Sequence, residues 1–311
     1  MRRTRADYER EQLERRLEVI QLPVTPLRHH GYLAPADRWT WDGEPDAVGV
    51  ADDGTAYVVW PSLRPSNAKS ATVHPSADGA SEAVRLETEL RPSFVQPLGQ
   101  GRILLAAART RGEPNAEVWT FAGELVTRGQ LGDAIEHCLT TASGKLWVGY
   151  FDEALSGEGP QSHGLARFTA DFGVDWLYPF QELPPIVDCY ALNVDGETAH
   201  CYAYTDFHIV SISDADAADH GPAPKRSASR LLVAGDRAVL IGGSRAEYDL
   251  VTPLRIDTDG IHLDGQQRRL VLPDGLEAQR LRYVCRGADL HAFAGATWYR
   301  ISLEDLLAAS D

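Results

Sequence analysis

The chain has 311 residues, of which 43% are hydrophobic and 24% are charged. It is long enough to bury a large core and too apolar to be a disordered chain. The 45 Asp and Glu residues outnumber the 30 Lys and Arg residues, so the formal net charge is −15. Because binding to nucleic-acid phosphates needs a basic surface, this acidic protein is not expected to bind DNA or RNA.

The N-terminal residues contain no apolar core of a signal peptide, and no stretch approaches the ~20 apolar residues of a membrane span. We therefore expect a cytoplasmic protein with no membrane partner. The four cysteines lie within apolar, strand-like runs and form no CxxC pair. They are expected to be buried thiols of a reducing compartment, not disulfides or zinc ligands.

Near the N-terminus, Leu13, Leu17 and Ile20 recur at helical spacing among charged residues. This pattern predicts a short N-terminal helix over residues 5–20. We expect the helix to cap the fold, and docking of a partner on its apolar side is the alternative.

A short pattern recurs six times between residues 47 and 302: an apolar run, a turn that ends in glycine, and a second apolar run. The turn glycines are Gly54, Gly101, Gly144, Gly196, Gly235 and Gly287. A third strand follows in most copies, and several continue into a fourth, as at residues 174–178. Four short strands per unit at this period are typical of a β-propeller blade. The sequence therefore predicts an all-β fold, a six-bladed β-propeller.

The last unit has only three expected strands before the chain ends, so the ring needs a fourth strand from elsewhere. The N-terminal segment is spare, and we expect residues 18–22 or 38–41 to pair with the last blade. Joining the two ends removes the exposed edges of an open ring. The expected organisation is a helix and closure strand over residues 1–45, followed by the propeller over residues 46–311.

The third unit carries the residues SGKLWVG at 143–149 and GLARF at 164–168. This unit resembles the blade repeat of two-component-regulator propellers. It is also similar, more weakly, to blades of gluconolactonase-like six-bladed enzymes. The match covers about one blade and implies a propeller. The lactonase resemblance would also imply a divalent metal held by Glu, Asn and Asp in the central channel, but no complete set of these ligands stands out.

Polar side chains near the starts of first strands, and in the longest loop of the same face, are candidates for a ligand site at the mouth of the channel. They are Asp133, Glu136, Tyr150, Asp152, Glu153, Asp188 and Asn193. Glu136 and Asp188 lie on first strands of adjacent units, so we expect them to be close together. His137 follows Glu136 directly, and strand alternation predicts that only one of the two faces the channel.

The candidate acids have three interpretations. Glu136 and Asp188 could be oxygen ligands of a cation such as Ca²⁺. The acids could instead form an acid–base pair. The third interpretation is structural: the acids hydrogen-bond neighbouring backbones or face water in the channel.

The sequence contains no GxxxxGK[ST] or GxGxxG phosphate-binding motif and no HExxH zinc motif. A propeller fold alone does not specify a function, and the sequence leaves open whether the chain is an enzyme. We expect first a non-catalytic platform that binds a protein or a small-molecule ligand on the long-loop face. The alternatives are a divalent-metal-dependent hydrolase of the lactonase kind, with its site in the central channel, and a carbohydrate-active propeller with two carboxyls facing each other across a pocket.

Overall fold

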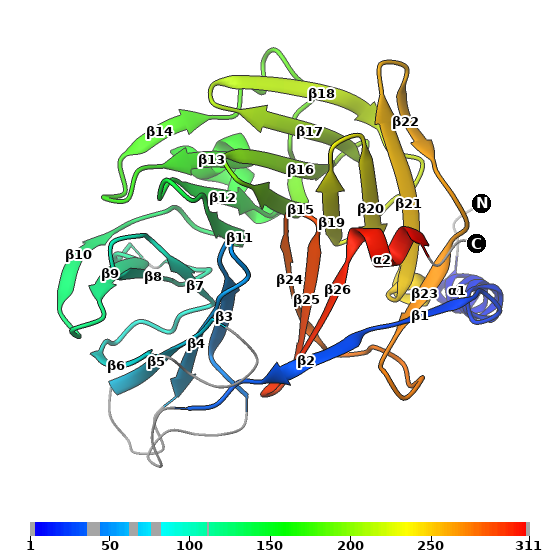
Figure 1. Cartoon of the computed structure of the whole chain (residues 1–311). Coiled ribbons are helices and arrows are strands. Elements are labelled where there is room, and N and C mark those ends of the chain that lie inside the picture. Colours follow the sequence, from blue (N-terminus) through cyan, green and yellow to red (C-terminus); the bar gives the residue numbers. More distant parts are fainter. Residues whose placement is uncertain (1–3, 36–43, 62–67, 76–81, 111, 309–311) are drawn as a thin grey trace.

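The structure is a computed structural model that describes residues 4–35, 44–61, 68–75, 82–110 and 112–308. Within these residues, 26 strands form six sheets. The sheets are arranged around a common centre (Figure 1), so the fold is a mostly β, six-bladed propeller. The Gly-centred repeat therefore predicts the architecture correctly.

The first four blades are antiparallel sheets of four strands each, in sequence order from the centre outwards. The first blade consists of β3 (Ala47–Val50), β4 (Ala56–Pro61), β5 (Ala68–His74) and β6 (Glu82–Glu87). The second consists of β7 (Phe94–Pro97), β8 (Arg102–Ala106), β9 (Ala116–Thr120) and β10 (Leu125–Gly129). The third consists of β11 (Ile135–Thr140), β12 (Leu146–Tyr150), β13 (Leu165–Phe168) and β14 (Val174–Leu177). The fourth consists of β15 (Asp188–Asp195), β16 (Thr198–Tyr204), β17 (His208–Ser213) and β18 (Asp216–Pro222).

The last two blades each receive a strand from the N-terminal segment. The fifth blade contains β19 (Arg230–Ala234), β20 (Arg237–Ile241), β21 (Leu250–Asp257), β22 (Gly260–Leu263) and β23 (Arg268–Val271), and β1 (Val24–Pro26) pairs in parallel with β23. The sixth contains β24 (Arg282–Arg286), β25 (Asp289–Ala294) and β26 (Thr297–Ser302), and β2 (Arg28–Tyr32) pairs antiparallel with β26. The N-terminal segment therefore closes the ring, as expected.

The segment that closes the ring is not one of the two predicted from the sequence. Residues 18–22 include the end of the helix and the turn after it, and residues 38–41 lie outside the described residues. The closing strand β2 has the sequence RHHGY, and three of its five side chains are exposed. An outermost strand packs few side chains, so it needs no apolar alternation that a sequence pattern could reveal.

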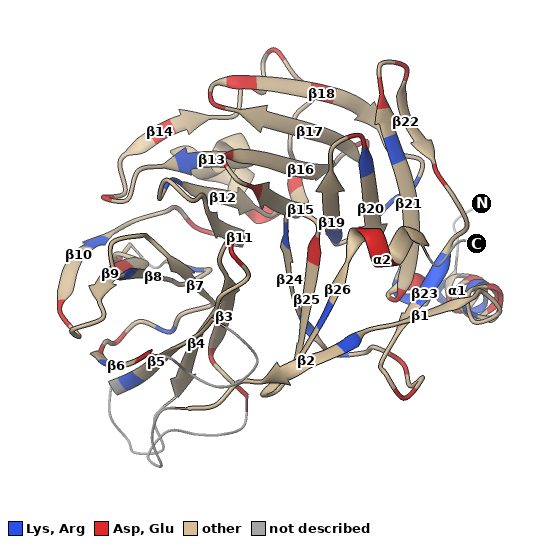
Figure 2. Cartoon of the chain, viewed as in Figure 1, with Lys and Arg blue, Asp and Glu red and all other residues tan. Residues whose placement is uncertain are grey.

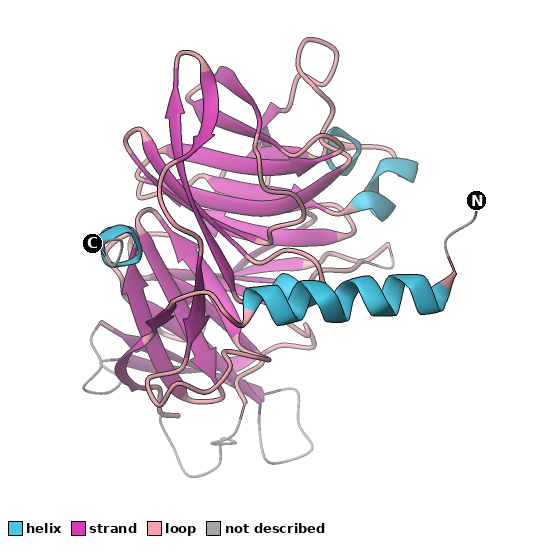
Figure 3. Ribbon diagram, turned by 90° about the vertical axis from the view of Figure 1, so that its right-hand side faces the viewer, coloured by secondary structure: helices cyan, strands magenta, loops and turns pink. Residues whose placement is uncertain are grey.

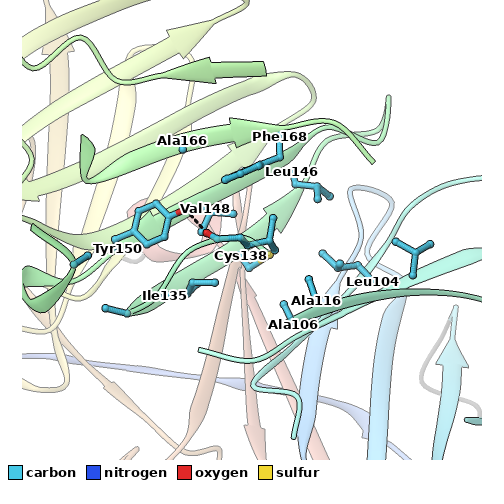
Figure 4. Close-up of a cluster of buried hydrophobic side chains, with 14 of the residues drawn as sticks. Leu104, Ala106, Ala116, Ile135, Cys138, Leu146, Val148, Tyr150, Ala166 and Phe168 are labelled. Atoms are coloured by element: carbon cyan, nitrogen blue, oxygen red, sulfur yellow. Dashed lines mark hydrogen bonds between the residues drawn. The ribbon is translucent and has the colours of Figure 1, made fainter. Parts of the chain in front are cut away.

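The six turn glycines and the six cores explain how the blades form and stack. Each turn glycine has a positive φ, between 51° and 87°, a conformation that glycine adopts without steric cost. Six buried hydrophobic clusters fill the spaces between neighbouring blades. Figure 4 shows the cluster between the second and third blades. Because each blade buries both faces against its neighbours, the ring is held together by inter-blade packing.

The N-terminal helix α1 (Arg5–Val19) begins at Thr4, whose side chain caps the first turn. It docks through polar side chains: Arg16 forms an ion pair of 2.6 Å with Asp249, next to the short 3-10 helix η3 (Arg245–Glu247) of the fifth blade. The predicted apolar side instead faces solvent, since Leu13 is 61% exposed and Leu17 is 53% exposed. The helix lies at the periphery of the ring (Figure 1), with its N-terminal end projecting past the strands (Figure 3).

Two further short 3-10 helices lie in the long loop of the third blade, η1 (Asp152–Ser156) and η2 (Pro160–His163). A second α-helix, α2 (Leu303–Ala308), ends the described chain. Among the described residues, no helix is long and apolar enough to cross a membrane. All four cysteines are buried free thiols, as the sequence predicts.

Candidate functional site

A cavity of about 310 Å³ lies at the centre of the ring, and the first strand of every blade contributes to its wall. Its lining residues include Val48 of β3, Phe94 and Gln96 of β7, Glu136 and His137 of β11, Ala191 of β15, Arg230 of β19, and Arg282 and Tyr283 of β24. The volume corresponds to about ten water molecules at about 30 Å³ each. Cavities of this size, lined by apolar walls with a few polar groups, commonly bind small molecules.

One end of the channel, where the first strands lead into the glycine turns, is filled by hydrogen-bonded groups. Arg286 at the end of β24 donates from Nη2 to the carbonyl of Thr140, 2.5 Å away in the opposite blade. The Nδ2 of Asn193 donates to the carbonyls of Leu231, at 2.9 Å, and Gly287, at 2.7 Å. The backbone N–H of Gly287 donates in turn to the Oδ1 of Asn193, at 2.7 Å. The cavity is therefore reached from the opposite end, where the first strands begin.

Asn193, which the sequence suggests as a ligand-binding residue, forms structural hydrogen bonds instead. Its side chain is fully buried, and both its donors and its acceptor are used by backbone groups of the fifth and sixth blades. Asn193 therefore joins three blades at the closed end of the cavity.

The open end of the cavity is charged on one side and apolar on the other. Glu136 is the second residue of β11 and Asp188 is the first residue of β15. Arg230 and Arg282 are the first residues of β19 and β24. At this position the third and fourth blades carry an acid, and the fifth and sixth blades carry an arginine. The first and second blades contribute Val48 and Phe94 instead. Among the described residues as a whole, by contrast, acidic and basic positions are dispersed among the blades (Figure 2).

On the acidic side, the structure brings three carboxyl groups within electrostatic reach of one another. The pKa of Asp188 is raised to about 6, mainly by burial and also by the negative charges of Glu136 and Asp152. None of the three carboxyls forms an ion pair with any described residue. Like charges held this closely destabilise one another unless a cation compensates them.

The three carboxyls do not fit the divalent metal that the lactonase resemblance implies. In the described part of the chain, no group of three or more His, Cys, Asp or Glu side chains is arranged to hold a metal ion. Ca²⁺ takes six to eight oxygen ligands, and two or three separated carboxylates do not provide such a set.

On the basic side, two arginines line the cavity without carboxylate partners. The guanidinium of Arg230 lies over the ring of Tyr283, with its central carbon 3.8 Å from the ring centroid. Burial lowers the pKa of both Arg230 and Arg282, because it disfavours the charged form. Neither guanidinium forms an ion pair with a carboxylate of the described residues, but Glu44 and Asp46 interact electrostatically with Arg282 and raise its pKa.

Three other predicted site residues lie next to the cavity but belong to the loop and the core around it. Arg109 binds both Glu153, at 2.5 Å, and Asp133, at 3.5 Å, so these two acids connect the loops of the second and third blades. Tyr150 is fully buried (Figure 4), and its hydroxyl donates to the carbonyl of Leu131. Its burial raises its pKa well above the ordinary value, so the hydroxyl stays protonated.

All of residues 136–139 contribute to the cavity wall, so the prediction that only one of Glu136 and His137 faces the channel stays a prediction. The pairing of β11 with β12 shifts register between Ile135 and His137. Such a β-bulge breaks the strict alternation of side chains on which that prediction rests. The Nε2 of His137 is buried and has no hydrogen-bond partner among the described residues.

Sequence reasoning missed Arg230, Arg282 and Tyr283, although the position of the two arginines carried a signal. Each arginine occupies the start of a first strand, as Glu136 and Asp188 do. A search restricted to acids at these positions could not find them. Comparing the same position in all six units would have revealed both charges.

Comparison with known proteins identifies the fold and no family. No family model and no curated protein sequence matches the chain. The chain resembles the solved structure of Hsv2 from Kluyveromyces lactis, with a TM-score of 0.51, 9% identity, and coverage of 84% of this chain and 74% of that one. It also resembles the calcium-binding protein regucalcin from Agrobacterium tumefaciens, with a TM-score of 0.48, 12% identity, and coverage of 90% and 95%.

A third similar structure is the extracellular domain of a putative hybrid two-component system from B. thetaiotaomicron. Its TM-score is 0.48 at 10% identity, and the match covers 92% of this chain and 38% of that one. At such low identities, structural likeness shows only that the chain shares the propeller fold.

Proposed function

We propose that this propeller is a binding protein that takes up a small polar ligand in its central cavity. The observation that carries the proposal is the set of charged side chains around the open end that lack partners of their own. Arg230 is half-buried, and Asp188, which is also half-buried, is held beside two other acids. Because unpaired charges in such a position are costly, a ligand that supplies partners would be bound favourably.

The two enzymatic alternatives have less support from the geometry. A hydrolase that depends on a divalent metal needs a group of ligands that the described residues do not form. A carbohydrate-active site needs two carboxyls facing each other across a pocket. Glu136 and Asp188 come from adjacent blades and lie on one side of the cavity.

A protein partner on the loop face is also less favoured than a small ligand. The exposed acids Asp133 and Glu153 of that face are already bound by Arg109. The unpaired charges of Glu136, Arg230 and Arg282 line the central cavity, where one small molecule can contact charges of both signs.

The test is to block the open end of the cavity. Calorimetric titration of a panel of sugars, lactones, organic acids, amines and amino acids should reveal at least one compound that binds the wild type. Ser229 lines the cavity and is exposed, so Ser229→Trp should obstruct the opening without disturbing the core. Leu276→Trp is the matched control, because Leu276 is 63% exposed and does not line the cavity.

We expect Ser229→Trp to abolish binding and Leu276→Trp to preserve it. Failure of every compound to bind, or equal binding by Ser229→Trp and the wild type, would overturn the proposal. Turnover of a lactone in the presence of divalent metal would favour the hydrolase instead.

A further inference from the structure

We infer that the ligand is dipolar: a cationic group binds beside Glu136 and Asp188, and a carboxylate or similar oxyanion binds to Arg230 and Arg282. This inference rests on the proposed function and specifies its ligand. It follows from where the four charged side chains lie, how they are partnered and what surrounds them.

The four side chains share one level of the ring. Each is the first or second residue of a first strand, and the four strands β11, β15, β19 and β24 belong to four consecutive blades. First strands run side by side around the centre of the propeller (Figure 1), so their starting residues surround the same opening. Glu136, Arg230 and Arg282 line the cavity, and Asp188 lies within electrostatic range of Glu136 on its acidic side.

The acids and arginines do not neutralise one another. None of Glu136, Asp188, Arg230 and Arg282 forms a hydrogen bond or an ion pair with another described side chain. Elsewhere the chain pairs its charges readily, as Arg167 does with Asp175 at 2.6 Å and Arg300 with Asp289 at 2.7 Å. Glu136, Arg230 and Arg282 line the cavity, so unpaired charges of both signs meet there.

Arg230 is oriented to bind an oxyanion. The central carbon of its guanidinium lies 3.8 Å from the centroid of the Tyr283 ring, and the group forms no ion pair with a carboxylate of the described residues. A planar guanidinium held in this way can donate two parallel hydrogen bonds to a carboxylate. Arg282, on the same strand as Tyr283, adds a second positive charge.

The remaining wall fits the uncharged part of such a ligand. Val48 and Phe94 line the cavity from the first and second blades, where no charged side chain contributes to the lining. At about 310 Å³, the cavity suits a metabolite-sized molecule.

A ligand with a single charge fits less well. A purely cationic ligand would leave the two arginines unpaired and facing its positive charge, and a purely anionic ligand would leave the acids in the same position. Because unfavourable contacts of this kind discriminate among ligands as strongly as favourable ones do, the wall selects for both charges together.

The test uses ω-amino carboxylates, from 4-aminobutanoate to 8-aminooctanoate, titrated calorimetrically into the full chain. Each is compared with the alkylamine and the alkyl carboxylate of the same length. We expect at least one length of the dipolar series to bind tenfold or more tightly than both single-charge analogues. Arg230→Gln should remove its advantage over the amine, and Glu136→Gln should remove its advantage over the carboxylate.

Arg85→Gln and Glu87→Gln are matched controls, because this exposed ion pair lies on the outer strand β6. Both should bind like the wild type. If no dipolar compound binds better than its single-charge analogues, or if the cavity variants bind like the controls, the inference is overturned. The proposed function still holds after that result if a compound of the wider panel binds the wild type and Ser229→Trp blocks its binding. If no compound binds at all, the proposed function is overturned as well.

Discussion

Replacing Asn193 by alanine tests whether this residue holds the blades together or contacts a ligand. The side chain is fully buried and makes three hydrogen bonds, to the carbonyls of Leu231 and Gly287 and from the N–H of Gly287. Removing one partner of a buried hydrogen bond costs about 1–3 kcal/mol. Asn193→Ala leaves three backbone groups without this partner.

The loss should lie toward the lower end of that range for each bond. The N–H of Gly287 also donates to the carbonyl of Val194 at 3.2 Å, and the carbonyl of Gly287 also accepts from Val233 at 3.4 Å. These weaker contacts compensate in part, so we expect a total loss of about 3 kcal/mol in the free energy of unfolding.

The assay is urea unfolding followed by tryptophan fluorescence, since Trp147 and Trp298 are fully buried reporters. Gln21→Ala is the control, because it truncates an exposed side-chain amide and should change stability by less than about 0.5 kcal/mol. An unchanged free energy of unfolding in Asn193→Ala would refute the reasoning. If ligand affinity fell at the same time, Asn193 would be a binding residue after all.

Three further outcomes are expected. Deleting residues 1–33 should lower the urea midpoint strongly, because it exposes the edges of β23 and β26. Deleting residues 1–22 keeps both strands and should lower the midpoint less. Equal midpoints for the two truncated chains would contradict closure of the ring by β1 and β2. Asp188→Asn should raise the melting temperature, because the folded state raises the pKa of this carboxyl from 3.8 to about 6 and so disfavours its ionised form. The gain in melting temperature is full above pH 6 and should fade as the pH falls toward 3.8. A gain that does not depend on pH would contradict this explanation. Burial lowers the pKa of His291 to about 3, so its contribution to stability is full above pH 6.5 and is lost as the pH falls toward 3. Urea midpoints between pH 7 and pH 4 should therefore fall less steeply in His291→Gln than in the wild type, and identical slopes would rule this explanation out.

The blades were predictable because their signals are local. A tight turn that needs positive φ selects glycine, and the apolar runs on either side are strands buried in inter-blade cores. The closing strand was not predictable in the same way. Pairing of β2 with β26 depends on where the rest of the ring ends, and the residues of β2 contribute little to the core.

The candidate site was predictable only in part, for two physical reasons. β12 is buried on both faces, so alternation could not show that Tyr150 points into the core. The pairing of β15 with β16 shifts register between Cys189 and Ala191, which changes the facing of every later residue on β15, including Asn193. Bulges of this kind leave no mark that a single sequence reveals.

Because an N-terminal strand closes the ring, β2 is synthesised long before the strand with which it pairs. β2 ends at Tyr32, but its partner β26 is complete only at Ser302, about 270 residues later. At roughly 5–20 residues per second, the ribosome needs about 15–55 s to make that interval. Throughout this time β2 carries an unpaired edge, and its charged and imidazole side chains, Arg28, His29 and His30, discourage pairing with a wrong strand. The sequence that looked too polar for a strand is therefore well suited to a segment that must stay available until the last blade emerges.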